Sequence, residues 1–228
     1  ADSITTWRMT ASAHGRDAKI AGATAVEGKR GGGLSFDGKD DHVELGDLGE
    51  FDAATIAFWF RGEKLDADEG FHGLVTSDAW EEGVMHVPVK EGRVDVYLHM
   101  GEKTRGRLTS RRLKSDTWYH VAVVADTGTG LLRLYVNGGE QDIDDISRLS
   151  TKIKLIDQVA GREHDGEQFA RHFRGSIDDV RIYGRALDVR EIQALCPGAV
   201  PLAGRDPRNI RTGHVIPDEG YCDQPYVV

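Results

Sequence analysis

Cysteines and long apolar segments are scarce in this sequence. The two cysteines, Cys196 and Cys222, both lie near the C-terminus, and their spacing fits no metal or redox motif. One disulfide closing this loop is expected in an oxidising compartment, with two free thiols as the alternative. No segment approaches the ~20 consecutive apolar residues of a membrane helix, so membrane insertion is not expected.

Catalytic and phosphate-binding signatures are also lacking. The nine histidines form no His-Glu-x-x-His pattern, and no Gly-x-Ser-x-Gly segment occurs, so neither zinc hydrolysis nor serine acyl transfer is indicated. Residues 31–33 (GGG) are not followed by Gly-Lys-Ser/Thr and do not form a phosphate-binding loop. Basic residues are in deficit, with a formal net charge of -9, which argues against nucleic acid as a partner.

Glycine and short β-type segments are abundant. The 28 glycines, 39% hydrophobic and 29% charged residues are typical of a soluble globular domain with many turns. Segment 55–61 (TIAFWFR) is apolar on both faces, which predicts a central strand buried on both sides. Segment 93–99 (RVDVYLH) alternates apolar and polar residues, which predicts one core face and one polar face.

Turn and cap residues set the limits of the other elements. Further strands are expected at 83–89, 118–125, 131–136 and 175–183. Tight turns are predicted at 90–92 and 137–139, where glycine permits left-handed conformations. Asp188 and Glu191 have the spacing of a capping box, which predicts a helix over 188–195. We therefore expect one domain over 1–198, and a tail or linker over 199–228 that holds four of the six prolines.

Three segments share the order and spacing of one known pattern. They are 34–44 (LSFDGKDDHVE), 118–138 (WYHVAV and later LYVNG) and 175–187 (GSIDDVRIY and then RAL). Together they resemble the laminin-G/pentraxin-like domains of the concanavalin A-like superfamily. The resemblance implies an all-β fold, a two-sheet antiparallel jelly-roll sandwich with one short C-terminal helix. Members include lectin-like carbohydrate binders, adhesion modules and domains appended to secreted glycosidases, so function must be argued from the site.

The tail carries a second resemblance. Segment 209–226 (NIRTGHVIPDEGYCDQPY) resembles the entry to a sialidase-like propeller, which implies a C-terminal sialidase-like catalytic domain as a partner. No Ser-x-Asp-x-Gly-x-Thr-Trp box of such a propeller occurs in this chain. The first residues show neither the basic nor the apolar region of a signal peptide, and we expect that a signal was removed from an extracellular or periplasmic protein.

Two groups of carboxylates are candidate calcium ligands. Asp37, with Asp40 or Asp41, should approach Asp179 or Asp178 where the first and last strands pair, and calcium prefers such oxygen ligands. The alternative is that Asp37 caps an Asx-turn and Asp178 is solvated.

The second group lies in loops 77–82 and 161–168, which resemble the calcium loops of pentraxins. That resemblance implies Asp78, Glu163 and Asp165 as ligands, although His164 stands between the acids and no Asn follows Asp78. The alternative is a solvated charged loop.

The polar face of strand 93–99 is the candidate carbohydrate site. Aromatic rings can stack on sugars and polar groups can bind hydroxyls. The residues assigned to it are Trp80, Asp95, Tyr97, His99 and Arg133, with His86 beside them. The alternative is that one sheet face is simply wet and that Trp80 covers the core.

The leading hypothesis is a non-catalytic, lectin-like module of a secreted protein that binds glycans, with or without calcium, as an accessory to a glycosidase. An adhesion domain that contacts protein is the first alternative. A lectin-fold glycoside hydrolase using Glu140 and Asp142 is the second, because segment 140–145 (EQDIDD) superficially resembles the Glu-x-Asp-x-x-Glu strand of glucanases. The third acid here is Asp, one carbon shorter, which would displace a general acid.

Overall fold

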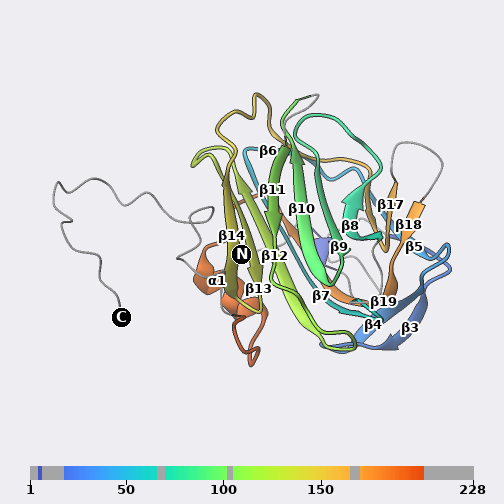
Figure 1. The fold of residues 1–228 in the computed structure, drawn as a ribbon. Coiled ribbons are helices and arrows are strands. Elements are labelled where there is room, and N and C mark those ends of the chain that lie inside the picture. Colours follow the sequence, from blue (N-terminus) through green and yellow to red (C-terminus); the bar gives the residue numbers. More distant parts are fainter. Residues whose placement is uncertain (1–4, 7–17, 66–69, 102–104, 165–169, 203–228) are drawn as a thin grey trace, which may run out of the picture.

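The computed structural model describes residues 5–6, 18–65, 70–101, 105–164 and 170–202. Within these residues the chain forms two large antiparallel sheets and one helix, which confirms the predicted sandwich (Figure 1). The eight-stranded sheet has the order β14 (Gly139–Asp145), β13 (Leu131–Val136), β12 (Tyr119–Asp126), β7 (Ala53–Gly62), β19 (Arg174–Tyr183), β4 (Gly32–Asp37) and β3 (Thr24–Glu27), with β1 (Thr5–Thr6) paired to β19.

The seven-stranded sheet packs against the first. Its order is β11 (Arg105–Thr109), β10 (Arg93–His99), β9 (Met85–Lys90), β8 (Phe71–Ser77), β16 (Gln158–Ala160), β5 (His42–Gly46) and β2 (Lys19–Ala21). Two small sheets pair β15 (Ile153–Leu155) with β6 (Gly49–Phe51), and β17 (Arg162–His164) with β18 (Ala170–His172). Helix α1 (Val189–Leu195) and the β17–β18 hairpin lie on opposite sides of the molecule in Figure 1.

Strand β7 lies at the centre of the eight-stranded sheet, between β12 and β19. Ile56, Phe58 and Phe60 are fully buried in the core between the sheets. Ala57 and Trp59 are buried on the other face, so the prediction of a strand covered on both sides is confirmed. A strand buried on both faces is apolar throughout, whereas a strand with one open face alternates.

The predicted hairpin turns are confirmed as two-residue connections with positive φ. Glu91 and Gly92 have φ of 49° and 72°, and Asn137 and Gly138 have φ of 51° and 76°. Two successive left-handed residues form the turn whose twist matches that of the paired strands. The turn over residues 91–92 sets the β9–β10 register, in which Tyr97 pairs with His86.

Helix α1 forms where the capping box predicts it. The Asp188 side chain accepts hydrogen bonds from the backbone N–H of Arg190 and Glu191, and the Glu191 side chain accepts from the N–H of Asp188. Arg185 donates two further hydrogen bonds to Glu191, at 2.9 and 2.7 Å. These bonds fix the helix start and turn Ile192 onto the outer face of the eight-stranded sheet.

Candidate functional site

Aromatic and polar side chains gather on the outer surface of the seven-stranded sheet. On β10, Val94, Val96 and Leu98 face the core, so the alternating residues between them face outward. We call this outer surface the ring face. Its members are Phe71, Trp80, His86, Lys90, Asp95, Tyr97, His99, Arg105 and Arg107.

Trp80 lies at one end of the ring face. Its indole stacks on the His86 ring, with centroids 4.4 Å apart and planes at 30°, and meets His99 edge-on at 5.2 Å. Trp80 is half-buried, and its Nε1, like Nε2 of His99, has no hydrogen-bond partner within the described part of the chain. Packing from two strands therefore holds the indole in place, and the two partnerless ring nitrogens, Nε1 of Trp80 and Nε2 of His99, are themselves buried.

Both histidines beneath Trp80 have a pKa below the usual value of an imidazole. Burial lowers the pKa of His86 to about 3, and the neighbouring His99 adds to this effect. Burial and the charge of Arg105 also lower the pKa of His99. Desolvation disfavours the charged form of an imidazole, so His86 is uncharged at neutral pH. The Trp80 end of the ring face is thus apolar, with cations only at its border.

Tyr97 lies at the other end of the ring face and is held by a buried carboxylate. Its hydroxyl donates to Asp95 Oδ2 at 3.1 Å, and Arg107 Nη2 lies 3.5 Å from the same oxygen. Burial, followed by the charge of Asp95, raises the pKa of Tyr97, so its phenol stays protonated. The Phe71 ring packs against Tyr97 with centroids 5.9 Å apart. The face therefore presents fixed rings beside hydrogen-bonding groups.

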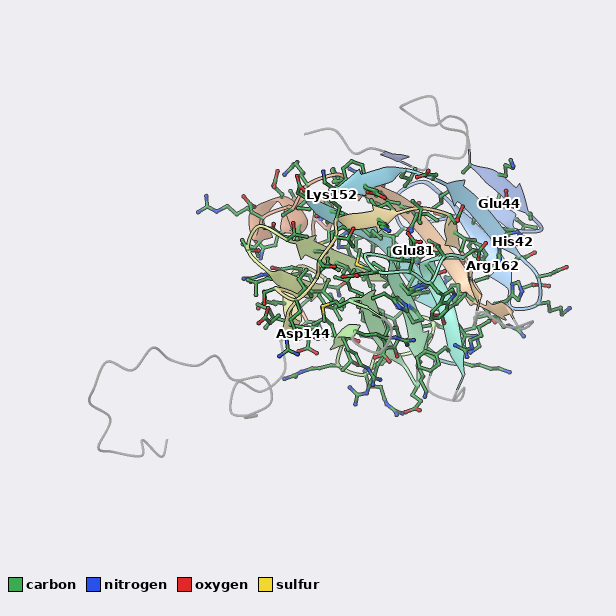
Figure 2. The ribbon with its side chains drawn as sticks, turned by 90° about the horizontal axis from the view of Figure 1, so that it is seen from above. His42, Glu44, Glu81, Asp144, Lys152 and Arg162 are labelled. Atoms are coloured by element: carbon green, nitrogen blue, oxygen red, sulfur yellow. The ribbon has the colours of Figure 1, made fainter. Side chains whose placement is uncertain are left out.

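The β17–β18 hairpin borders the ring face along β8. Thr76 Oγ1 donates to the Arg162 carbonyl at 2.6 Å, and a Cβ at Gly73 would overlap that carbonyl, so only glycine permits this close approach. In Figure 2, Arg162 of this hairpin and Asp144 of β14 lie well apart, on either side of the centre of the domain. The hairpin thus packs on β8, while among the described outward-facing residues of β9, β10 and β11, Lys90 and Tyr97 are partly exposed and Arg105 and Arg107 are exposed.

The loop carboxylates predicted to bind calcium already have protein partners. Asp78 Oδ2 accepts a hydrogen bond from Arg162 Nη2 at 2.6 Å, and the buried Glu163 lies 3.6 Å from Arg171. Asp165 lies outside the described residues. This calcium site stays a prediction.

The prediction that Asp37 and Asp179 share one calcium site is wrong. Strands β4 and β19 do pair, but the register places Asp37 opposite Arg174, at the end of the pair remote from Asp179. Asp179 instead binds Arg181 at 2.9 Å. The prediction used only the fact that the two strands pair, whereas the antiparallel register determines which residues of the two strands lie opposite each other.

The aspartates around residue 38 do form a local cluster. Oxygen atoms of Asp37, Asp40 and Asp41 lie within 4.8 Å of one another. Asp37 Oδ1 accepts from the Lys39 N–H at 2.9 Å, which is the Asx-turn, and Asp41 Oδ2 accepts from the Asp37 N–H at 2.8 Å. The hydrogen bond from Lys39 lowers the pKa of Asp37.

Arg133 does not belong to the ring face. It lies on β13 of the other sheet, where Leu132 and Leu134 face the core, and it donates to Glu140 Oε2 at 2.8 Å. Its assignment beside Tyr97 is therefore wrong, because the two strands belong to different sheets.

The two acids of the hydrolase alternative point in different directions. Glu140 pairs with the outward-facing Tyr135, and Asp142 pairs with the inward-facing Leu134, because the strand register shifts between them. Asp142 Oδ2 accepts from the Thr109 N–H of β11 at 3.0 Å. Paired carboxylates must flank one bond, and this geometry does not provide that.

Three features of the site lacked a sequence prediction. Arg105 and Arg107 reach the ring face from β11, and the Arg-Gly-Arg-Leu alternation at 105–108 was a usable signal for a strand with a cationic face. Phe71 comes from β8. A cavity of about 170 Å³ also opens beside Lys90 and is lined by Glu63, Lys64, Leu65, His72, Val89, Lys90, Glu91, Phe173 and Arg174.

Of the two C-terminal cysteines, Cys196 lies within the described residues. Cys196 is buried behind α1, with Sγ 3.5 Å from the Ile192 carbonyl, and burial raises its pKa. Cys222 lies outside the described residues, so the disulfide stays a prediction. Among the described helices, none has the length and apolarity to cross a bilayer.

Solved structures with this fold share little sequence with the chain. The binding domain of botulinum neurotoxin serotype G has a TM-score of 0.67 at 15% identity, over 85% of this chain and 50% of that one. The ligand binding domain of serotype D, in complex with N-acetylneuraminic acid, has a TM-score of 0.67 at 16% identity, with coverage of 85% and 50%. The binding domain of Paraclostridial Mosquitocidal Protein 1 has a TM-score of 0.66 at 16% identity, with coverage of 85% and 51%.

The chain thus spans about half the length of these binding domains, and at this identity the likeness shows the fold alone. A search of curated protein sequences found no match. A laminin G family model, described as the concanavalin A-like lectin/glucanases superfamily, matches residues 37–193, which is more than half of the chain. Together with the two-sheet antiparallel sandwich, this match shows that the chain belongs to the concanavalin A-like lectin/glucanase superfamily.

Proposed function

We propose that the chain is a non-catalytic glycan-binding module and that the ring face is its binding surface. The observation that carries this proposal is the convergence of partly exposed rings and exposed guanidinium groups on one outer sheet surface. Trp80 and Tyr97 are partly exposed rings, and Arg105 and Arg107 place exposed hydrogen-bond donors beside them. Sugars are recognised by such a combination, because their C–H faces pack on rings and their hydroxyls need partners.

The proposal also covers the location of this module and the domain that accompanies it. We place it in an extracellular or periplasmic protein, as an accessory to a sialidase-like catalytic domain, where it would keep the enzyme close to its polysaccharide. The chain itself then needs no catalytic residues. The divergent Glu140 and Asp142 support this division of labour. Calcium binding is an optional part of the proposal: the ion would have Asp78, Glu163 and Asp165, or Asp37 and Asp41, as its ligands.

A glycan-array screen of the wild-type chain, first with calcium and then with a chelator, tests the proposal. We expect calcium-independent binding if the rings carry recognition, and loss on chelation if the loop carboxylates do. Trp80→Ala should lower the affinity about tenfold or more, because stacking on one ring is worth about 1–3 kcal/mol in comparable sites. Trp118→Ala is the matched control, since Trp118 lies under Arg61 rather than on the ring face.

The outcomes separate the competing functions. Equal losses in the two tryptophan variants would move the site away from the ring face. An array with no bound glycan, for a chain whose circular dichroism and unfolding curve are those of a folded protein, would favour the adhesion alternative.

A further inference from the structure

Each aromatic ring of the ring face has a cation lying over it. The guanidinium carbon of Arg105 is 5.8 Å from the Trp80 ring centre, and that of Arg107 is 5.4 Å from Tyr97. Lys90 Nζ lies 4.5 Å above Phe71. These distances are those of cation–π contacts. Lys90 also pairs with Glu91 at 3.7 Å and Arg107 with Asp95 at 3.5 Å, so among the described residues Arg105 is the member of the three with no ion pair.

The positive charge continues along the edge of the same sheet. Residues 105–114 contain five cations and no acid, and we call this segment the basic edge; its cations are Arg105, Arg107, Arg111, Arg112 and Lys114. All five side chains are exposed. Within the described residues, only Arg107 among them forms an ion pair, with Asp95.

Of the acids beside the basic edge, the buried Asp95 lies on the ring face, 3.5 Å from Arg107, whereas the two acids of β14 are turned away from it. Asp142 and Asp144 of β14 accept hydrogen bonds from the backbone N–H groups of Thr109 and Arg107, at 3.0 and 2.8 Å. The side chain of Arg107 projects from the other direction, over Tyr97. Sheet geometry thus separates the carboxylates, which close the edge of the sandwich, from the guanidinium groups on its surface.

We infer that the ligand of the ring face is an anionic glycan, a sugar chain that carries carboxylate or sulfate groups. This inference rests on the proposed function and specifies its ligand class. A guanidinium over a ring keeps its N–H donors at its own edge, where they can hold a carboxylate or sulfate in two parallel hydrogen bonds. Any sugar that packs on Trp80 or Tyr97 meets this cation, and an anionic sugar gains an ion pair with it that a neutral sugar does not.

A polysaccharide is a better match for this surface than nucleic acid. Charge on most acidic glycans is sparser than on a phosphate backbone, and the sugar rings between the charges can pack on Trp80 and Tyr97. The overall charge of -9 opposes a dense polyanion outside the few cations of the basic edge.

Binding of three polysaccharides to the whole chain tests the inference: chondroitin sulfate, hyaluronan and uncharged dextran. Calorimetric titrations at about 50 and 200 mM salt should show binding to the two anionic polymers that weakens with salt, and much weaker binding to dextran. Arg105→Gln should lower the affinity for chondroitin sulfate about two- to fivefold, and Arg105→Gln with Arg107→Gln about tenfold. Arg105→Lys keeps the charge and should recover part of the loss.

The matched control is Arg190→Gln, which removes the same charge from exposed helix α1 on the opposite side of the domain. It should leave all affinities unchanged. Equal losses in Arg190→Gln and Arg105→Gln would mean that net charge alone matters, which overturns the inference. Dextran bound as tightly as chondroitin sulfate would also overturn it, while leaving the proposed function intact.

Two further outcomes are decisive. Single-stranded DNA bound as tightly as chondroitin sulfate, with the same loss in Arg105→Gln, would overturn the assignment to glycans. No binding of any polysaccharide would overturn both the inference and the proposed function. Because Arg105 is exposed, its substitution should leave the unfolding transition unchanged, and that measurement accompanies each titration.

Discussion

The outer faces of the two sheets are built on the same two-residue alternation but have opposite environments. The outer face of the eight-stranded sheet carries an apolar cluster that α1 and the preceding loop cover, made of Ala57, Ala122, Val124, Tyr135, Tyr183, Leu187 and Ile192. The outer face of the seven-stranded sheet carries rings, histidines and arginines, and only the β17–β18 hairpin borders it among the described elements. An apolar face needs a cover to be stable in water, whereas the ring face does not. The comparison therefore separates a structural face, covered by α1, from the face that we propose to bind glycans.

The largest expected effect comes from removing the cover of the structural face. Ile192→Ala deletes a fully buried side chain of α1 and should lower the free energy of unfolding by about 2–5 kcal/mol. Denaturant unfolding measures this change. Glycan affinity per folded molecule should stay at the wild-type value, because the ring face lies on the other sheet. A loss below about 0.5 kcal/mol would mean that α1 does not stabilise the face it covers.

Acid should weaken the domain through a buried histidine on each outer face. Burial lowers the pKa of His86, on the ring face, and of His120, on the structural face, to about 3. Between pH 6.5 and pH 3 the unfolded chain takes up protons that the folded chain does not, so stability is present above pH 6.5 and is lost as the pH falls. Each histidine should contribute up to about 1.4 kcal/mol per pH unit.

Unfolding curves of His86→Phe and His120→Phe at several pH values between 7 and 4.5 check this expectation. Each variant should show a shallower pH dependence than the wild type, whatever its stability at pH 7. Slopes identical to that of the wild type would show that carboxylates, and not these histidines, cause the acid sensitivity.

A smaller effect is expected at the helix start. Asp188→Ala removes two hydrogen bonds from the first turn of α1 and should cost about 1 kcal/mol. Asp188→Asn keeps a capping side chain and should recover most of this loss, as thermal unfolding can measure. A variant as stable as the wild type would mean that the bidentate Arg185 and Glu191 pair holds the helix start without the cap.

The smallest effect is expected for Glu140, an acid of the glycoside hydrolase alternative. Glu140→Gln breaks a half-exposed ion pair with Arg133 on the structural side and should change stability by less than about 1 kcal/mol. Glycan binding should be unchanged, in contrast to Trp80→Ala. Hydrolysis of a glycan that Glu140→Gln abolishes would contradict the non-catalytic proposal, and a reducing-sugar assay would detect it.

Local patterns predicted much of the fold. Strands Arg93–His99 and Leu131–Val136 have the bounds expected from their alternation, and the helix begins at its capping box. These features depend on residues within a few positions of one another, where side-chain period and hydrogen-bonding preference are decisive. The grouping of Asp95, Tyr97 and His99 on one face followed from the same period.

Contacts between segments far apart in the chain were harder to predict from the sequence. Arg133 and Tyr97 each fit an alternating strand, and nothing in either strand states which sheet it joins. Asp37 and Asp179 lie in strands that do pair, yet the register places them at opposite ends. A strand presents the same backbone groups to any neighbour, so partner and register depend on the whole packed core.

The sequence by itself therefore determined the class of fold and the face of strand 93–99 that points to the core, because these depend on composition and on a period of two, while the superfamily followed from the resemblance of three segments to a known family. Only the tertiary structure decided that Arg105 and Arg107 lie over Trp80 and Tyr97, and that Glu140 and Asp142 diverge. Those arrangements arise from pairing between strands far apart in the chain and from one shift of register, and local preference does not encode them.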